Sequence, residues 1–232
     1  MKKLLFVVSL MMVFTLVPMA MADQVATVGG SGYGPYQTGS GGEFTLQVKD
    51  SGLSWILNSY VPGVTSDIVG APYLHNFQTF CVEHGEYIYA WTGFDVSISN
   101  GSIFTAKPLT QGAAWLYSQF QIGQLAGYDY TRDPNNGANE TQQLQDAIWW
   151  FMGVGSDPGN AFSLAGSAHG GFTLNNGIYP VAVLNLWATG HVGERGFERQ
   201  DVLVCVPEPA TMLLLGSGLI GLAGFARRRF KK

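Results

Sequence analysis

The stretch "LQDAIWWF", residues 144–151, combines the pattern of a buried helix with two polar side chains. Its apolar residues recur at helical spacing and form one stripe, which is typical of a helix that packs against a core. Gln145 and Asp146 interrupt this pattern, and Gln145 lies one helical turn before Trp149. We therefore predict a core helix here, beginning at a cap formed by Asn139 or Thr141 and ending near Met152. The question is why a glutamine stands against an aromatic surface.

The segments around this helix predict an α+β domain with a β-rich scaffold and two or three helices. Residues 43–50 alternate apolar and polar side chains, as a half-buried strand does. We expect further strands over 76–98 and 199–206, and a helix over 110–127 that ends at Gly127. We expect loops over 128–139 and 153–172, and a short helix over 181–190, with a strand as the alternative.

The N-terminal segment, residues 1–22, has the three parts of a secretory signal. Lys2 and Lys3 precede an apolar run, and Ala20-Met21-Ala22 is a small-x-small cleavage site. The apolar run is short for a membrane span. We expect signal peptidase to cleave after residue 22, with an uncleaved anchor helix as the alternative.

The C-terminal segment, residues 207–232, begins with Pro207-Glu208-Pro209 and continues as an apolar, Gly-rich run over 210–226. As a helix, this run is about 25 Å long, enough for a thin bilayer. The basic tail after it contains Arg227, Arg228 and Arg229, and the positive-inside rule keeps such a tail in the cytoplasm.

This C-terminal segment resembles the PEP-CTERM sorting signal of Gram-negative bacteria. The resemblance implies that the chain is anchored transiently in the inner membrane. An exosortase-type membrane protease then processes it near the Pro-Glu-Pro motif. The protein would finally lie on the cell surface or in the extracellular matrix of a biofilm. A permanent C-terminal anchor is the alternative, because hydropathy alone does not separate the two.

Residues 23–206 lie between these signals and have the size of one domain. We expect a Gly-rich lead-in over 23–42 and a folded part over 43–206. Charged residues are sparse, and seven of the twelve basic residues belong to the signal and the tail. The exported part is therefore acidic, and it has no basic patch for phosphates, which argues against a nucleic-acid partner.

The chain has two cysteines, Cys81 and Cys205. An exported protein meets an oxidising compartment, so one interpretation is a disulfide between them. The chain would then be a structural or matrix-binding module, with its aromatic residues in the core or on a glycan-stacking face. Cys205 lies two residues before Pro207, beside the expected processing site, which is a poor place for a disulfide partner.

A different interpretation comes from the residues around Cys81 and Gln145. Phe80-Cys81-Val82 and, later, the stretch from Leu144 to Trp149 together resemble the thioester domains of bacterial surface adhesins. The resemblance covers roughly residues 75–190 and includes "QGAAWLYSQF" between the two motifs. Members of that family often have threonine directly before the glutamine, where this chain has Leu144. A Thr141-Gln142 pair lies one turn earlier, so Gln142 is the alternative to Gln145.

The resemblance implies an internal thioester between Cys81 and Gln145, which an amine on another molecule would open to form an amide. It implies an amine-bearing surface protein, a polyamine or a matrix component as the target. The bond would form once, without turnover, so we expect an adhesin and not an enzyme, with no cofactor and no metal. Four residues are expected to shield or assist the bond, namely Phe80, Glu83, His84 and Trp149.

Two further interpretations of Cys81 stay open. A cysteine hydrolase would pair Cys81 with His169 or His191, although a nucleophilic cysteine usually lies at a helix N-terminus and "TFCVEH" is typical of a strand. Cys81-x-x-His84 is also half of a zinc motif, and the sequence has no second half.

Overall fold

The computed structural model of the protein describes residues 23–27, 42–67, 74–89, 92–131 and 138–207. The signal segment, most of the Gly-rich lead-in and the apolar sorting run lie outside these residues. Within the described ranges, no helix is both long enough and apolar enough to cross a membrane.

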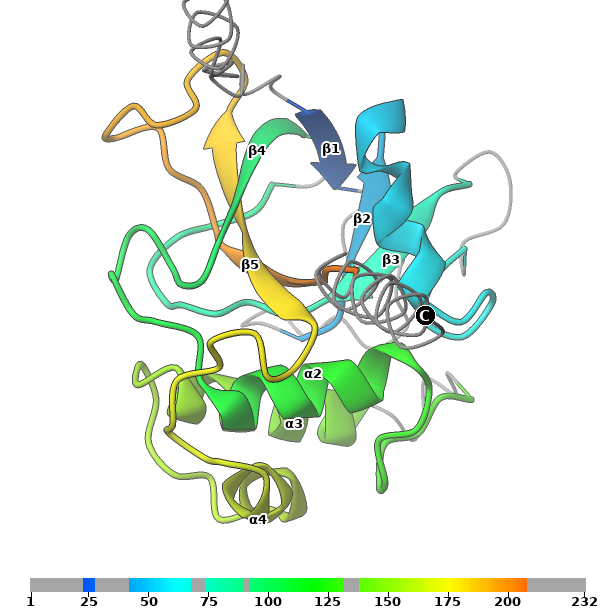
Figure 1. The fold of residues 1–232 in the computed structure, drawn as a ribbon, viewed down its shortest axis with the longest axis vertical. Coiled ribbons are helices and arrows are strands. Elements are labelled where there is room, and N and C mark those ends of the chain that lie inside the picture. The colour runs from blue at the N-terminus through cyan, green and yellow to red at the C-terminus, as the bar shows by residue number, and fades with distance from the viewer. Residues whose placement is uncertain (1–22, 28–41, 68–73, 90–91, 132–137, 208–232) are drawn as a thin grey trace, which may run out of the picture.

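Six antiparallel strands form a single sheet, drawn in Figure 1. Their order across the sheet is β3-β2-β1-β4-β5-β6, so β1 is inserted between β2 and β4. The strands are β1 (Asp23–Thr27), β2 (Phe44–Val48), β3 (Asn76–Thr79), β4 (Gly93–Ser99), β5 (Val181–Ala188) and β6 (Val202–Cys205). Adjacent strands pair through regular registers, for example Leu46 with Phe77.

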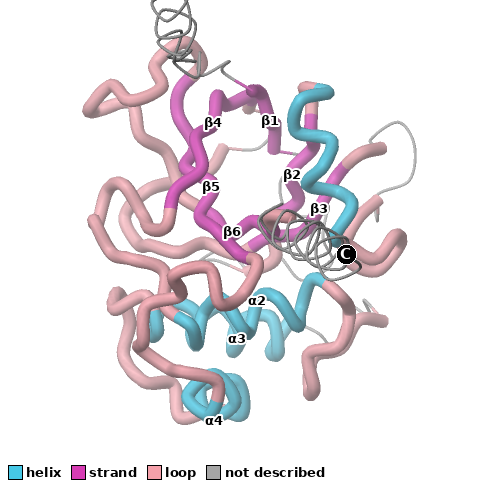
Figure 2. The backbone as a smooth tube through the Cα atoms, in the orientation of Figure 1, coloured by secondary structure: helices cyan, strands magenta, loops and turns pink. Residues whose placement is uncertain are grey.

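The two edges of this sheet meet and nearly close it into a ring, which Figure 2 shows in magenta. The chain just beyond β3 pairs with β6, with Cys81 opposite Val202. The Leu203 N–H donates to the Phe80 carbonyl oxygen at 3.1 Å, and the Val82 N–H donates to the Asp201 carbonyl oxygen at 3.1 Å. This closure protects both edge strands, because unpaired edges invite association with other chains.

One face of the sheet is almost wholly apolar. Residues that are directly opposite in an antiparallel register share a face, so the pairing follows this face from strand to strand. It is formed by Val25, Leu46, Phe77, Phe94, Val96, Leu184, Leu186, Val202 and Val204, all of them buried. The other face carries buried polar side chains, among them Thr45, Gln78, Asp95 and Asn185.

Four helices occur in the described part of the chain, and three of them form a layer beside the sheet. The 3-10 helix η1 (Ser51–Ser59) follows β2 and contacts β2 and β6. Helix α2 (Gln111–Gln121) contacts β5 and β6, and α3 (Ala138–Phe151) and α4 (Ala161–Ala168) pack against α2 and each other.

Local signals explain where these helices begin and end. The Thr110 side chain caps α2 by accepting a hydrogen bond from the Ala113 N–H, and Asn160 caps α4 through the Ser163 N–H. Helix α2 ends at Gln121, where Gly123 has a φ of +71°, a left-handed conformation that glycine adopts without strain.

The ring of Phe151, at the end of α3, is buried between two glycines of the neighbouring helices. A Cβ atom on Gly112 of α2 would lie 2.8 Å from a ring carbon of Phe151, and a Cβ on Gly166 of α4 would clash with the same ring. These glycines let α2 and α4 approach α3, so Phe151 joins the three helices into one layer.

The structure confirms the strands expected within 43–50, 76–98 and 199–206, and it corrects several other expectations.

Residues 181–188 form a strand and not the expected helix. Every residue of this strand but the last is buried, so the sequence lacks the alternation of apolar and polar residues that marks a strand. Helix α4 lies inside the expected loop 153–172, and α3 begins at Ala138, before either proposed cap. The described residues contain four helices, more than the two or three expected, since η1 and α4 were missed. Strand β1 lies within the expected lead-in.

Candidate functional site

The structure brings the side chain of Gln145 into contact with the main chain of Cys81. Both residues are buried, Gln145 completely. The Gln145 Oε1 atom accepts a hydrogen bond of 3.0 Å from the Cys81 N–H, and the Nε2 atom donates one of 2.8 Å to the Cys81 carbonyl oxygen. One of these hydrogen bonds lies on each side of the Cys81 α-carbon. Together they place the carboxamide carbon of Gln145 beside Cys81.

The folded chain explains why the main chain of Cys81 needs such a partner. Opposite Val202, Cys81 forms a non-hydrogen-bonded pair, because the bonds to β6 are made by Phe80 and Val82. Its own N–H and C=O therefore point away from β6. The β2–β3 ladder ends at the pair Phe44 and Thr79, so no strand among the described residues pairs with Cys81 on that side. The Gln145 carboxamide takes the place of the missing peptide group.

The carbonyl oxygen of Gln145 receives a second main-chain donor. The Gly42 N–H donates to Oε1 at 3.1 Å, in addition to the Cys81 N–H. Two N–H groups directed at one buried carbonyl oxygen polarise it and stabilise negative charge on it, as the donors of an oxyanion hole do. The arrangement is therefore able to activate the Gln145 carbonyl carbon towards a nucleophile.

Aromatic residues next to this pair in the sequence are buried or partly buried. Phe80 and Phe151 are almost completely buried, Trp149 is 6 % exposed and Trp150 is partly buried. Phe80 packs edge-on against Phe120 of α2, with ring centroids 4.9 Å apart. Phe80 and Trp149 are two of the residues expected to shield or assist the bond. Both are buried, and their shielding role stays a prediction.

His84 is exposed, and its ring lies 3.8 Å from that of Trp149 at an angle of 37°. It thus covers part of the indole. Gln142, the alternative partner of Cys81, instead donates to the Asp146 carboxylate at 2.7 Å.

Two buried carboxyl groups lie close to Cys81. Glu83 accepts hydrogen bonds from the N–H and hydroxyl of Thr105, each at 3.2 Å, and Asp201 accepts one of 2.6 Å from the Ile103 N–H. Both hold the loop that follows β4. Glu83 also accepts a 3.4 Å hydrogen bond from the Asp201 N–H, so it orients main-chain groups.

These carboxyl groups and the low-dielectric surroundings shift several pKa values. Burial raises the pKa of Asp201 to about 8, and the Glu83 carboxylate adds to the shift. Burial likewise raises the pKa of Glu86 to about 7, with Glu83 as the second cause. The pKa of the Cys81 thiol is raised well above its ordinary value, first by burial and then by the charges of Glu83 and Asp201. Cys81 is therefore a neutral thiol at pH 7.

The two cysteines are free thiols on opposite faces of the sheet. Cys81 shares a face with Val202, and Cys205 lies three residues further along the same strand, an odd offset that reverses the face. Three residues of strand also separate their α-carbons by about 10 Å, beyond disulfide reach. The Cys81–Cys205 disulfide considered from the sequence is therefore absent, for a geometric reason.

The histidines considered for a hydrolase have other neighbours. His169 stacks on Trp115 of α2 at 3.7 Å, and His191 pairs with Glu194 at 2.9 Å. Among the described residues, no group of three or more His, Cys, Asp or Glu side chains is arranged to hold a metal ion.

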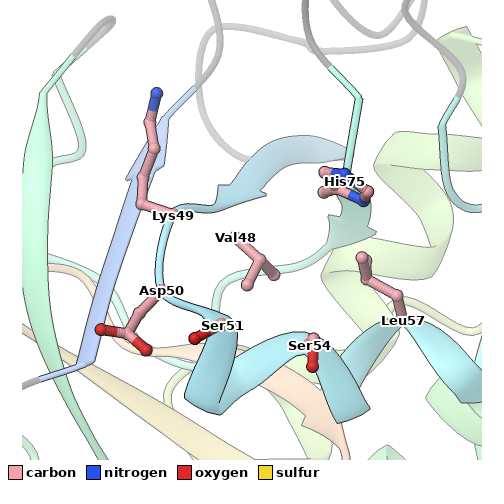
Figure 3. A pocket seen from close by; sticks show the side chains of 7 residues that line it. All are labelled: Val48, Lys49, Asp50, Ser51, Ser54, Leu57 and His75. Atoms are coloured by element: carbon pink, nitrogen blue, oxygen red, sulfur yellow. The ribbon is translucent and has the colours of Figure 1, made fainter.

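The described residues line several surface pockets. One of about 360 Å³ is lined by His84, Asp146 and Trp149 together with residues 155, 156 and 158. A second, of about 270 Å³, lies between the end of β2, η1 and His75 and contains no residue of the candidate site (Figure 3). A third, of about 340 Å³, is lined by Tyr87, Tyr89, Glu86 and Arg199 among others.

Comparison with known proteins identifies the end of the chain. Residues 206–229 match the family model of the PEP-CTERM protein-sorting motif. The motif indicates an exosortase substrate that is exported and carries a membrane-associated sorting signal, ending on the cell surface or in the extracellular space. No curated protein and no solved structure gives a significant match. The sorting prediction is thus supported, and the comparisons leave the folded domain unassigned.

Sequence reasoning missed two parts of the site. Gly42 was assigned to the Gly-rich lead-in and not to the folded part, although its N–H donates a hydrogen bond to Gln145. Asp201 was taken only as part of a final strand, although it is 1 % exposed and its charge acts on Cys81. A main-chain donor leaves no sequence signal. An aspartate directly before an apolar strand, as in "QDVLVCV", is only a weak sequence signal of a buried carboxyl group.

Proposed function

We propose that this protein is a covalent surface adhesin, in which an internal thioester between Cys81 and Gln145 reacts with amines on a target. The observation that carries the proposal is the contact of the two residues: the Gln145 carboxamide bonds both main-chain groups of Cys81 in a site with almost no solvent exposure. Export to the cell surface, indicated by the sorting motif, supports it, since an adhesin acts outside the cell.

The chemistry takes two steps. The Cys81 sulfur attacks the Gln145 carboxamide carbon, the C–N bond breaks, and ammonia leaves with the thiol proton. Later an amine attacks the same carbon, an amide forms, the C–S bond breaks, and the sulfur takes up the proton that the amine loses. The Gly42 and Cys81 N–H groups would stabilise the oxyanion in both steps.

The raised pKa of Cys81 favours the product of the second step. A thiol released in this buried, negatively charged surrounding stays protonated. A protonated thiol is a poor nucleophile, so it attacks the new amide slowly, as it attacks the Gln145 carboxamide slowly in the first step. The reaction then works once and makes a permanent bond, with no turnover.

A second function is supported by the same hydrogen bonds. The Gln145 carboxamide satisfies main-chain groups that would otherwise be unpaired at the edge of a ladder, and this role needs no covalent bond. The chain would then be a non-covalent structural or matrix-binding module that retains an intact glutamine and two free thiols.

Intact mass separates these functions. The intact mass of the full chain is measured before and after treatment with methylamine. Each value is compared with the mass calculated from the sequence between the observed termini. A thioester lowers the mass by about 17 Da, the loss of one ammonia, and methylamine converts the deficit into an adduct with release of one thiol. Cys81→Ala abolishes both changes, and Cys205→Ala, the matched control, keeps them. Full mass with no adduct would overturn the covalent proposal and favour the structural module.

A further inference from the structure

The pocket lined by His84, Asp146 and Trp149 is formed by residues that closely follow the two candidate thioester residues. His84 is three positions past Cys81, and Asp146 and Trp149 belong to the turn of α3 that begins at Gln145. On a helix, Trp149 and Gln145 are neighbours one turn apart, about 6 Å between Cβ atoms. This pocket, of about 360 Å³, therefore lies near the buried pair.

The lining groups have the chemistry of an ammonium site. Asp146 and Trp149 are three residues apart and so lie on one side of α3. A carboxylate attracts an ammonium ion and accepts its hydrogen bonds. Trp149 is 6 % exposed and His84 covers part of its indole, so Asp146 supplies the main attraction and the exposed part of the indole adds to it. The Gln142 amide holds one oxygen of Asp146 at 2.7 Å, which fixes the carboxylate in this orientation.

The charge of the exported domain supports a cationic ligand. Between residues 23 and 206 the sequence has fifteen acidic and five basic side chains. A negative surface raises the local concentration of cations and increases their association rate. An anionic amine would be repelled from the same surface.

We propose that this pocket binds the ammonium group of an incoming cationic amine, either a polyamine or a lysine side chain, and so selects positively charged amines for the thioester. The inference rests on the proposed function. The bound ammonium ion releases one proton to solvent, and the neutral amine then attacks the Gln145 carbonyl carbon as described above. Gln145 is fully buried, so an amine reaches it only after the side chains between them move.

The test compares a cationic with an acidic amine on the full chain. Adduct formation with spermidine and with taurine is followed by intact mass, and the ratio of the two rates is taken within each variant, which cancels their intrinsic nucleophilicity. Asp146→Asn keeps the oxygen that Gln142 bonds and removes the charge. We expect it to lower the spermidine-to-taurine ratio at least about fivefold.

Asp157→Asn is the matched control, because Asp157 lies in the adjacent loop, is exposed and does not line the pocket. It removes the same charge from the domain and should leave the ratio unchanged. A ratio that is equal in the wild type and Asp146→Asn overturns the inference. An equal fall in both variants also overturns it, since the overall charge and not the pocket would then select the amine.

A binding measurement separates failure of the pocket from failure of the thioester. In the Cys81→Ala protein no thioester forms, and spermidine binding is followed by calorimetry. We expect Asp146→Asn in this background to weaken binding at least about fivefold, and Asp157→Asn to leave it unchanged. If the wild type forms no adduct with any amine, the thioester proposal fails, and the calorimetric comparison alone tests whether the pocket binds an ammonium group. An unchanged affinity for spermidine in Asp146→Asn overturns the proposed ammonium site.

Discussion

The carboxamide of Gln145 pairs with the main chain of Cys81 as a neighbouring strand would, donating to its carbonyl oxygen at 2.8 Å and accepting from its N–H at 3.0 Å. A residue of helix α3 thus completes hydrogen bonding at the junction of β3 and β6. The same contact puts an electrophilic carbon beside a thiol-bearing residue, so one pair of hydrogen bonds serves both stability and the proposed chemistry.

Removing the carboxamide should destabilise the fold even where no thioester forms. In a Cys81→Ala background, Gln145→Leu leaves the N–H and C=O of residue 81 and the Gly42 N–H without their partner. We expect the free energy of unfolding to fall by at least about 2 kcal/mol, measured by urea denaturation. Gln142→Leu, at a partly exposed position of the same helix, should cost less than about 1 kcal/mol. Equal losses in the two variants would show that the pairing with residue 81 contributes little.

Gly166 should not tolerate a methyl group. A Cβ atom there meets the ring of Phe151, which is 1 % exposed and enclosed by the three-helix layer. We expect Gly166→Ala to lower the free energy of unfolding by about 1–3 kcal/mol, because overpacking forces the helices apart. Gly93→Ala is the matched control, since nothing lies within 4 Å of its added Cβ and its φ is not left-handed. A neutral Gly166→Ala would mean that the ring moves aside without cost.

Stability should decline as the pH rises towards 8. Asp201 and Glu86 have folded-state pKa values of about 8 and about 7, both raised chiefly by burial. Their unfolded values are near 4. A raised folded pKa contributes stability that is complete below the unfolded pKa and is lost as the pH passes through the folded pKa. We therefore expect the free energy of unfolding, from urea denaturation, to fall between about pH 4 and pH 8.

Asp201→Asn should flatten this decline, because the variant takes up no proton at that position on folding. The exposed Asp157→Asn should keep the wild-type slope. A wild-type stability that rises over this pH range would contradict the assignment of raised pKa values to the buried carboxyl groups.

Oxidation should not join the two cysteines within the folded protein. Cys81 and Cys205 are buried on opposite faces of the sheet and are free thiols. We expect the midpoint of thermal unfolding to be the same with and without a reductant, and the intact mass to show no loss of about 2 Da. A variant with Cys205→Ala serves as the reference that cannot form the bond. A reductant-dependent midpoint in the wild type alone would show that the closure of β3 on β6 is wrong.

Much of the fold could be predicted where local signals agree. The apolar stripe of residues 144–151 has a helical period, and 43–50 has the period of a strand, so both were assigned to the right element. Prediction failed where burial removes periodicity: β5 is buried on both faces and looks like a helix as easily as a strand. Helix α4, "AFSLAGSA", was hidden by the Gly and Ser residues around it.

The sequence by itself determined the sorting motif and singled out Cys81 and Gln145, because these depend on local composition and on residue type. Only the tertiary structure decided how the two residues meet. The closure of the sheet turns the N–H and C=O of Cys81 away from β6, and α3 brings a carboxamide to them. Main-chain groups are the same at every residue, so no pattern of side chains reveals which of them a fold leaves without a partner.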